Sequence, residues 1–166
     1  MNDSLTKMDI RKMQEELDQL RAEWPAVIEE VKRTRAFGDL SENYEYKAAK
    51  QAQNHNRSRQ RYLEGMIKTA RIIEEDAGED EVGLFDKVEI YIPEDDETQI
   101  IQVVTTIRVD PMKGLVSRES PFGKAILGKK AGDEVTVQVN EHYSYRAVIR
   151  SVTKMQDDGS APILEY

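Results

Sequence analysis

Two carboxylates three residues apart, Asp39 and Glu42, are the side chains whose type and spacing could best do chemistry. Carboxylate oxygens are the ligands that Mg²⁺ prefers, but two of them leave most of its coordination shell to water, substrate or a partner protein. The same spacing fits helix capping, in which Asp39 caps a helix and Glu42 lies at its third position near the positive dipole end. Partner-assisted metal binding and simple capping are both open at this point.

Basic residues lie on both sides of this acid pair: Lys32, Arg33, Arg35, Lys47 and Lys50. They could hold the end of a nucleic acid. They could also form a solvated helix face, paired with Glu29, Glu30 and Glu45 at helical spacing. The net charge of −8 argues against wrapping of a nucleic-acid backbone, so any such contact must be local.

The rest of the sequence offers little for an independent active site. There are no cysteines, which excludes disulfides and thiolate metal sites. We find no GxGxxG, Walker or HExxH motif and no plausible Ser-His-Asp set. No apolar run of about 18 residues predicts a membrane span, and no secretory signal is visible. We therefore expect a cytoplasmic protein without a membrane partner.

The acid pair lies between two segments with coiled-coil spacing. In the first, large or apolar residues recur at alternating steps of three and four: Ile10, Met13, Leu17, Leu20, Trp24, Val27 and Val31. Thr6 and Asp9 resemble a capping box at its start, and Gly38 is a natural stop. We expect Pro25 to kink this helix without dividing it. About 30 helical residues give an arm of roughly 45 Å.

The second segment, residues 49–73, has a similar spacing with a polar middle at Asn56 and Arg59. Folding a hairpin about residues 39–41 places Trp24 near Asn56 and Leu20 near Arg59. The acid pair would then lie at the end of a rigid arm that could enter a cavity in another molecule.

Beyond an acidic, glycine-containing segment the apolar period changes from 3.5 to 2, which is typical of strands. Residues 134–139 and 143–149 predict a hairpin. Ser120 and Pro121 predict the start of a short helix that stops at Gly128. The second half is thus a small antiparallel β-domain with one short helix, and the chain is α+β in class. We expect the acidic tail after Lys154 to fray.

Nearly the whole chain resembles the bacterial Gre transcript cleavage factors of the GreA type. Similar to the family's tip motif are Gly38–Asn43, Glu45–Tyr46 and Ala48–Lys50. Similar to its C-terminal signature are Ser120–Pro121, Ala125–Lys130 and Gly132–Val135. The chain departs from the family at Tyr44, where the residue is usually small, and at Phe37, where it is usually polar.

The resemblance implies an antiparallel coiled coil over residues 1–75, a linker over 76–83 and an FKBP-like domain over 84–166. In this family the globular domain docks on RNA polymerase near the secondary-channel entrance, and the coiled coil passes down the channel. The resemblance places that docking at four residues around the short helix: Ser120, Pro121, Leu127 and Gly128.

The resemblance also implies roles at the acid pair. Asp39 and Glu42 would help hold a catalytic Mg²⁺ shared with the polymerase active site, with Ser41 in support, and the chain alone would bind no cofactor. Four basic residues would lie near the 3′ end of the nascent RNA: Arg33, Arg35, Lys47 and Lys50. The polymerase would hydrolyse the backtracked RNA, so the chain itself would not be an enzyme. A monomer is expected, because the hairpin supplies its own coiled-coil partner.

Three other functions stay open. The chain could occupy the polymerase channel and regulate it without stimulating cleavage, although the intact acid pair favours cleavage. It could be a coiled-coil interaction protein unrelated to polymerase. A prolyl isomerase is the weakest alternative, because fold does not imply activity and no aromatic-lined pocket is evident in the sequence.

Overall fold

The computed structural model describes residues 2–38, 43–74 and 77–165. The chain divides into two compact units. The first, here called the helical unit, contains most of residues 10–71, and the second, the sheet unit, contains residues 4–9 and 72–165. The two long helices and the separate sheet confirm the predicted α+β class.

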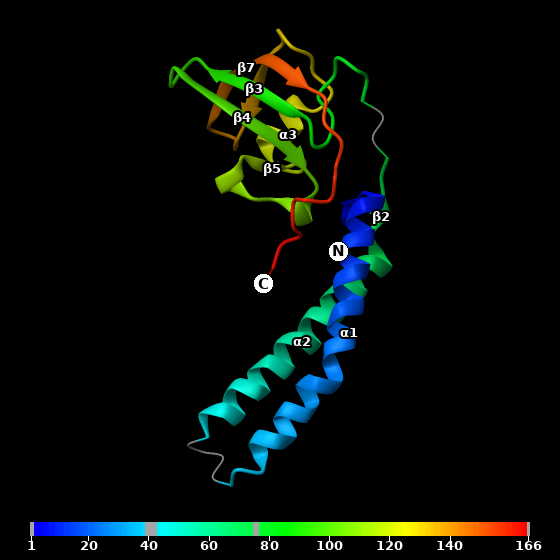
Figure 1. Ribbon diagram of the computed structural model, residues 1–166. Helices are drawn as coiled ribbons and strands as arrows, with labels where there is room; N and C mark the ends of the chain where they lie inside the picture. The colour runs from blue at the N-terminus through cyan, green and yellow to red at the C-terminus, as the bar shows by residue number, and fades with distance from the viewer. Residues whose placement is uncertain (1, 39–42, 75–76, 166) are drawn as a thin grey trace. The chain divides into compact units, whose positions relative to one another are not determined.

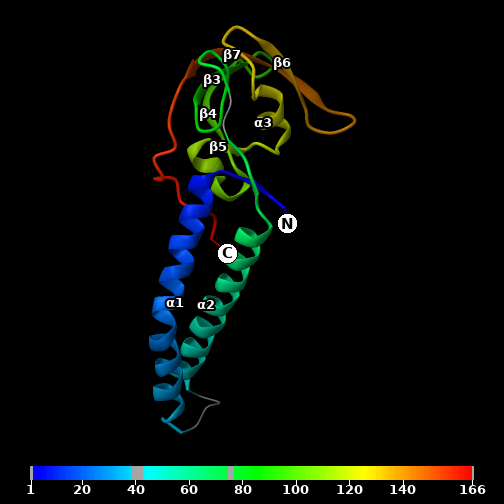
Figure 2. The same cartoon turned by 90° about the vertical axis from the view of Figure 1, so that its right-hand side faces the viewer.

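Two helices, α1 (Lys7–Arg35) and α2 (Tyr44–Thr69), run antiparallel and side by side (Figure 1, Figure 2). Pro25 lies inside α1 without ending it, as expected. Every predicted seam position of α1 is buried or half-buried, with Met13 and Leu17 the most enclosed. The seam prediction is therefore confirmed for α1. None of the helices in the described part of the chain is both long enough and apolar enough to cross a membrane.

The middle of the seam is polar, as the sequence indicates. Asn56 Nδ2 donates to the Leu20 carbonyl at 3.1 Å. Arg59 donates to both carboxylate oxygens of Glu16, at 2.7 and 3.1 Å. In an α-helix the carbonyl of residue 20 faces the N–H of residue 24, and the Arg57 guanidinium carbon lies 5.4 Å from the centre of the Trp24 ring. Asn56 therefore lies close to Trp24, as predicted, and the pairing of Leu20 with Arg59 stays a prediction.

The predicted capping box at the start of α1 is confirmed. The Thr6 N–H donates to Asp9 Oδ2 at 2.9 Å, and the Asp9 N–H donates to Thr6 Oγ1 at 3.2 Å. These reciprocal bonds satisfy N–H groups that have no partner within the helix.

A five-stranded sheet forms the centre of the sheet unit, in the order β5-β4-β3-β7-β6. Its strands are β3 (Lys87–Ile92), β4 (Glu97–Val104), β5 (Leu115–Ser117), β6 (Glu134–Gln138) and β7 (Ser144–Thr153). The predicted β6–β7 hairpin is confirmed. All neighbouring pairs are antiparallel except β4–β5, which is parallel and departs from the prediction. Two 3₁₀ turns, η1 (Thr106–Arg108) and η2 (Pro111–Lys113), lie in the connection between β4 and β5. Outside this sheet, β1 (Ser4–Leu5) pairs with β2 (Arg71–Ile72).

The short helix α3 (Pro121–Ile126) lies beside the sheet (Figure 2) and begins as predicted. Ser120 Oγ accepts the Gly123 N–H at 3.0 Å, and Pro121 occupies the first turn. A Cβ atom at Gly123 would lie 2.1 Å from the Ser117 carbonyl oxygen, so only glycine allows this close packing. Ile126 contributes to a core built mainly of sheet residues: Val88, Ile90, Val103, Val104, Val137, Ala147 and Ile149.

The C-terminal tail does not fray as expected but docks within the sheet unit. Its anchor is Arg108, whose side chain is fully buried. The guanidinium donates to both carboxylate oxygens of Asp157, at 2.6 and 3.3 Å, and to the Ala161 carbonyl at 2.9 Å. It also lies 3.5 Å from the buried carboxylate of Asp9. The carboxylates of Asp157 and Asp9 offset the free-energy cost of burying the Arg108 cation. The bonds from Arg108 to Asp157 and Ala161 hold the tail in place.

Candidate functional site

The predicted acids Asp39 and Glu42, and Ser41 between them, lie outside the residues that the structure describes. The described chain on either side, residues 33–38 and 43–50, is here called the tip segments. These segments flank the acid pair in the sequence.

Asn43 caps α2, which contradicts the alternative in which Asp39 caps this helix. The Asn43 Oδ1 atom accepts the N–H of Tyr46 at 2.9 Å. Helix α2 begins at Tyr44, several residues later than the capping prediction required. The side chain that caps α2 is thus uncharged.

The same Asn43 side chain ties the two tip segments together. Its Nδ2 atom donates to the Thr34 carbonyl at 2.7 Å. The Phe37 N–H donates to that same carbonyl at 3.2 Å. Thr34 is itself fully buried, and Gly38 follows with φ = +100°, a conformation that favours glycine. The Thr34 carbonyl oxygen therefore links the end of α1 to the start of α2.

Arg33 links charged and aromatic groups of both tip segments. It donates to the two Glu30 oxygens at 2.9 and 2.6 Å, and it lies 3.7 Å from the Glu45 carboxylate. Its guanidinium carbon is 5.3 Å from the centre of the Phe37 ring. The hydrogen bonds from Arg33 hold the pKa of the Glu30 carboxyl below its ordinary value, and those bonds raise the pKa of Arg33. Arg33 is therefore held in place by its neighbours.

The other three predicted RNA-binding cations have different surroundings. Lys50 Nζ donates to Gln53 Oε1 at 3.0 Å. Lys47 Nζ lies 5.4 Å from the centre of the Tyr44 ring. Arg35 is exposed in the last turn of α1. The fold thus brings all four cations to the tip segments, two of them beside an aromatic ring.

The acid pair has the donor chemistry that magnesium requires but not a full ligand set. Asp39 and Glu42 supply hard carboxylate oxygens, and Mg²⁺ demands near-octahedral coordination. Within the described ranges no cluster of three or more His, Asp or Glu side chains is suited to a metal. By donor type the two acids suit an ion whose other ligands would come from water or another molecule.

The residues predicted to dock on polymerase lie at the two ends of α3. Ser120 and Pro121 form its start, and Pro121 is exposed. Leu127 and Gly128 follow its end, where the Gly128 N–H donates to the Val82 carbonyl at 2.9 Å. The four residues thus frame one short helix of the sheet unit.

An aromatic-lined pocket of about 400 Å³ lies in the sheet unit, contrary to the expectation from the sequence. Its lining includes Phe122, Tyr143 and Tyr145, whose rings form a chain of contacts with centroids 6.4 and 6.0 Å apart. Burial raises the pKa of the Tyr145 hydroxyl. Sequence reasoning missed this pocket because its rings come from α3 and from the β6–β7 hairpin, which only the fold brings together.

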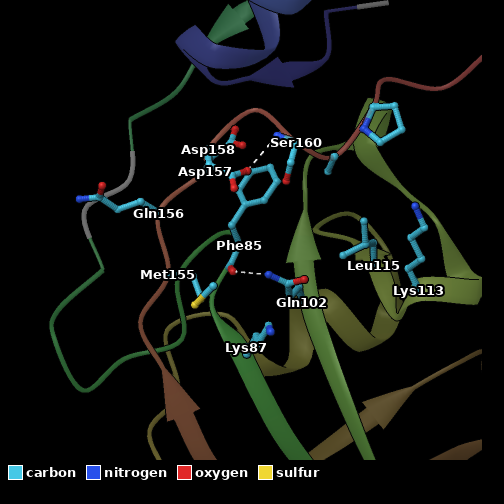
Figure 3. A pocket seen from close by; sticks show the side chains of 12 residues that line it. Phe85, Lys87, Gln102, Lys113, Leu115, Met155, Gln156, Asp157, Asp158 and Ser160 are labelled. Carbon is cyan, nitrogen blue, oxygen red and sulfur yellow. Dashed lines mark hydrogen bonds between the residues drawn. The ribbon is translucent and has the colours of Figure 1, made fainter.

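A second cavity, of about 310 Å³, lies between the docked tail and the sheet (Figure 3). Gln102 Nε2 donates to the Phe85 carbonyl at 2.7 Å on one side. Asp157, Asp158 and Ser160 of the tail line another side. None of the predicted site residues lines this cavity, and Asp157 is already bound to Arg108.

An antiparallel helix pair with an acid pair in its connecting segment, followed by a separate α+β unit, defines a two-part factor. A model of the family "Transcription elongation factor, N-terminal" matches residues 4–72. A model of "Transcription elongation factor, GreA/GreB, C-term" matches residues 77–154. The chain belongs to the GreA/GreB family of transcription elongation factors.

Curated relatives agree with this assignment. The chain is 43% identical over 143 residues to transcription elongation factor GreA of Mesomycoplasma hyopneumoniae (strain 7448), covering 86% of this chain and 89% of the relative. It is 44% identical over 137 residues to GreA of Thermoanaerobacter pseudethanolicus, covering 81% and 87%.

Among solved structures, GreA factor homolog 1 (Gfh1) of Thermus thermophilus is 25% identical, with 93% of this chain and all of that chain covered, at a TM-score of 0.43. The family assignment stands on the family models and the curated relatives.

Proposed function

We propose that this chain binds bacterial RNA polymerase as a monomer, inserts its helical hairpin into the secondary channel and stimulates cleavage of backtracked nascent RNA. The polymerase carries out the hydrolysis, and this chain supplies Asp39 and Glu42 in trans. Arrested transcription complexes are thereby rescued with a new RNA 3′ end.

The main support for this proposal is the set of contacts and charges in the tip segments. Asn43 caps α2 and ties it to the Thr34 carbonyl, which joins the two segments that flank the acid pair. Cations flank the acids on both sides, which suits an RNA end with its phosphates. The curated relatives named transcription elongation factor GreA support the same function.

Asp39 and Glu42 are the residues of this chain that would hold the shared magnesium, with Ser41 in support. When bound, such an ion activates a water molecule or stabilises the leaving oxygen in phosphodiester hydrolysis. The contribution of this chain is to deliver two carboxylates on a rigid helix pair. These ligands matter chiefly in the transition state, so their loss should reduce cleavage far more than binding.

The sheet unit supplies the proposed docking surface at the ends of α3. Pro121 is exposed, and the neighbouring Phe122 forms a wall of the aromatic pocket. Apolar area beside an exposed helix start is suited to burial against a protein surface. We assign polymerase binding to Ser120, Pro121, Leu127 and Gly128.

The test uses a stalled, backtracked elongation complex with 3′-extruded RNA. Wild-type protein should shorten the RNA, whereas Asp39→Asn and Glu42→Gln proteins should compete with wild type for the polymerase and shorten little RNA. Glu45→Gln is the matched control, because Glu45 lies on α2 beside Arg33 and outside the acid pair.

Two results would contradict the proposal. If wild type competes for the polymerase but yields no shortening, the chain is a channel-occupying regulator instead. If it fails to bind polymerase, it acts elsewhere as a coiled-coil interaction protein.

A further inference from the structure

Two aromatic side chains of the tip segments are largely exposed to solvent. Phe37, just after α1, is 57% exposed, and Tyr44, the first residue of α2, is 79% exposed. Exposure of so much apolar ring surface is unfavourable in water unless a ligand covers it.

Each exposed ring has a cation over it. The Arg33 guanidinium lies 5.3 Å from the centre of the Phe37 ring, and Lys47 Nζ lies 5.4 Å from the centre of the Tyr44 ring. A cation over one face leaves the opposite face of the ring for another flat group. Both rings thus combine apolar area with a nearby positive charge.

Backbone and side-chain bonds bring the two rings to one end of the hairpin. The Thr34 carbonyl accepts both the Phe37 N–H and the Asn43 side chain, and Asn43 directly precedes Tyr44. Arg33 also reaches Glu45, the residue after Tyr44. Phe37 and Tyr44 therefore both lie at the end of the hairpin where these bonds join the tip segments.

We propose that Phe37 and Tyr44 are a stacking platform for unpaired bases at the 3′ end of backtracked RNA, with Arg33 and Lys47 beside the phosphates. This inference rests on the proposed function and adds base contacts to it. Aromatic rings interleaved with cations are how proteins hold single-stranded nucleic acid without reading its sequence.

RNA suits this surface better than a protein partner does. The chain carries a net charge of −8, yet the cations Arg33, Arg35, Lys47 and Lys50 gather at the tip segments. Each ring lies beside a cation. This arrangement suits a nucleotide, whose base stacks on the ring while its phosphate pairs with the cation. A purely apolar protein contact would not need those charges.

The test places 2-aminopurine, whose fluorescence falls on stacking, at the 3′ terminus of backtracked RNA. Wild type and Tyr44→Phe should quench it, because both keep a ring at position 44. Phe37→Leu and Tyr44→Leu should quench less and bind this complex about 10-fold more weakly, the loss typical of one stacked base. All four proteins should bind equally to a complex without extruded RNA.

A second arm uses the protein alone with a short 2-aminopurine oligoribonucleotide at low salt. Quenching by wild type and Tyr44→Phe, but not by the leucine variants, supports the platform even if polymerase binding fails. Equal quenching by all four proteins in both arms overturns it. Equal weakening of the leucine variants on complexes with and without extruded RNA also overturns it, because the rings would then contact the polymerase.

Discussion

The side-chain amide of Asn43 donates to the main-chain carbonyl of Thr34 across 2.7 Å, while its oxygen caps α2 through the Tyr46 N–H. One side chain thus both begins the second helix and fastens it to the end of the first. Since the two tip segments carry the exposed rings and the cations, this bond sets the spacing of the groups that we propose to contact RNA.

Replacing this residue should loosen the end of the hairpin. Asn43→Ala loses a helix cap and the bond to Thr34, so we expect the free energy of unfolding of the helical unit to fall by roughly 2 kcal/mol. Urea denaturation followed by the fluorescence of Trp24, the only tryptophan, reports on this unit. Asn54→Ala on the exposed face of α2 is the matched control and should be close to neutral. An equal loss in both variants would contradict the assignment.

The buried pair of Glu16 and Arg59 should show strong coupling. Glu16→Ala removes the carboxylate from a guanidinium that is only 5% exposed, and we expect a loss of roughly 2–4 kcal/mol in the free energy of unfolding. In an Arg59→Leu background, the same Glu16→Ala change should cost about 0.5 kcal/mol or less, because no buried charge is left behind. A double-mutant cycle by urea denaturation measures the coupling, and additive effects would show that the pair is not a unit.

Arg108 should hold the C-terminal tail in place. Arg108→Met leaves the buried Asp9 carboxylate and Asp157 without their cation, so we expect a loss of about 3–5 kcal/mol in the sheet unit. Hydrogen exchange of the Leu164 N–H, which donates to the Ile107 carbonyl at 2.7 Å, should become much faster. Arg146→Met is the control, because its pair with Glu134 is exposed and worth little. Unchanged protection of Leu164 in Arg108→Met would refute this role.

The pair of Glu30 and Arg33 should respond to acid. The pKa of Glu30 is lowered in the folded protein, mainly by its hydrogen bond from Arg33. The pair therefore adds stability at pH values above the ordinary glutamate pKa, and this contribution is lost as the pH falls through the lowered pKa. Carboxyl NMR titration should find Glu30 below the ordinary value, and Arg33→Gln should return it toward that value. A Glu30 pKa that Arg33→Gln leaves unchanged would exclude this cause.

Local signals in the sequence predicted most of the helical features. The capping box of Thr6 and Asp9 and the Ser120–Pro121 helix start depend on neighbouring residues, so the sequence shows them directly. The position of Trp24 close to Asn56 also follows from local signals, because the heptad spacing of the two segments sets which positions face each other.

Features built from distant segments could not be predicted. The parallel β4–β5 pair depends on the connection between these strands, which contains two 3₁₀ turns. The docked tail depends on Arg108, which lies about 50 residues before its partner Asp157. The tip residues are a prediction from a local motif, whereas the aromatic pocket needs α3 and the β6–β7 hairpin together.

The magnesium dependence of RNA cleavage tests the central claim most directly. Backtracked complexes saturated with wild type, Asp39→Asn or Glu42→Gln protein would be followed over a Mg²⁺ titration. We expect wild type to lower the Mg²⁺ concentration for half-maximal cleavage, and both variants to require as much Mg²⁺ as the polymerase alone. If the variants, bound to saturation, retain the wild-type Mg²⁺ requirement, the two carboxylates do not share the metal ion and the proposal is wrong.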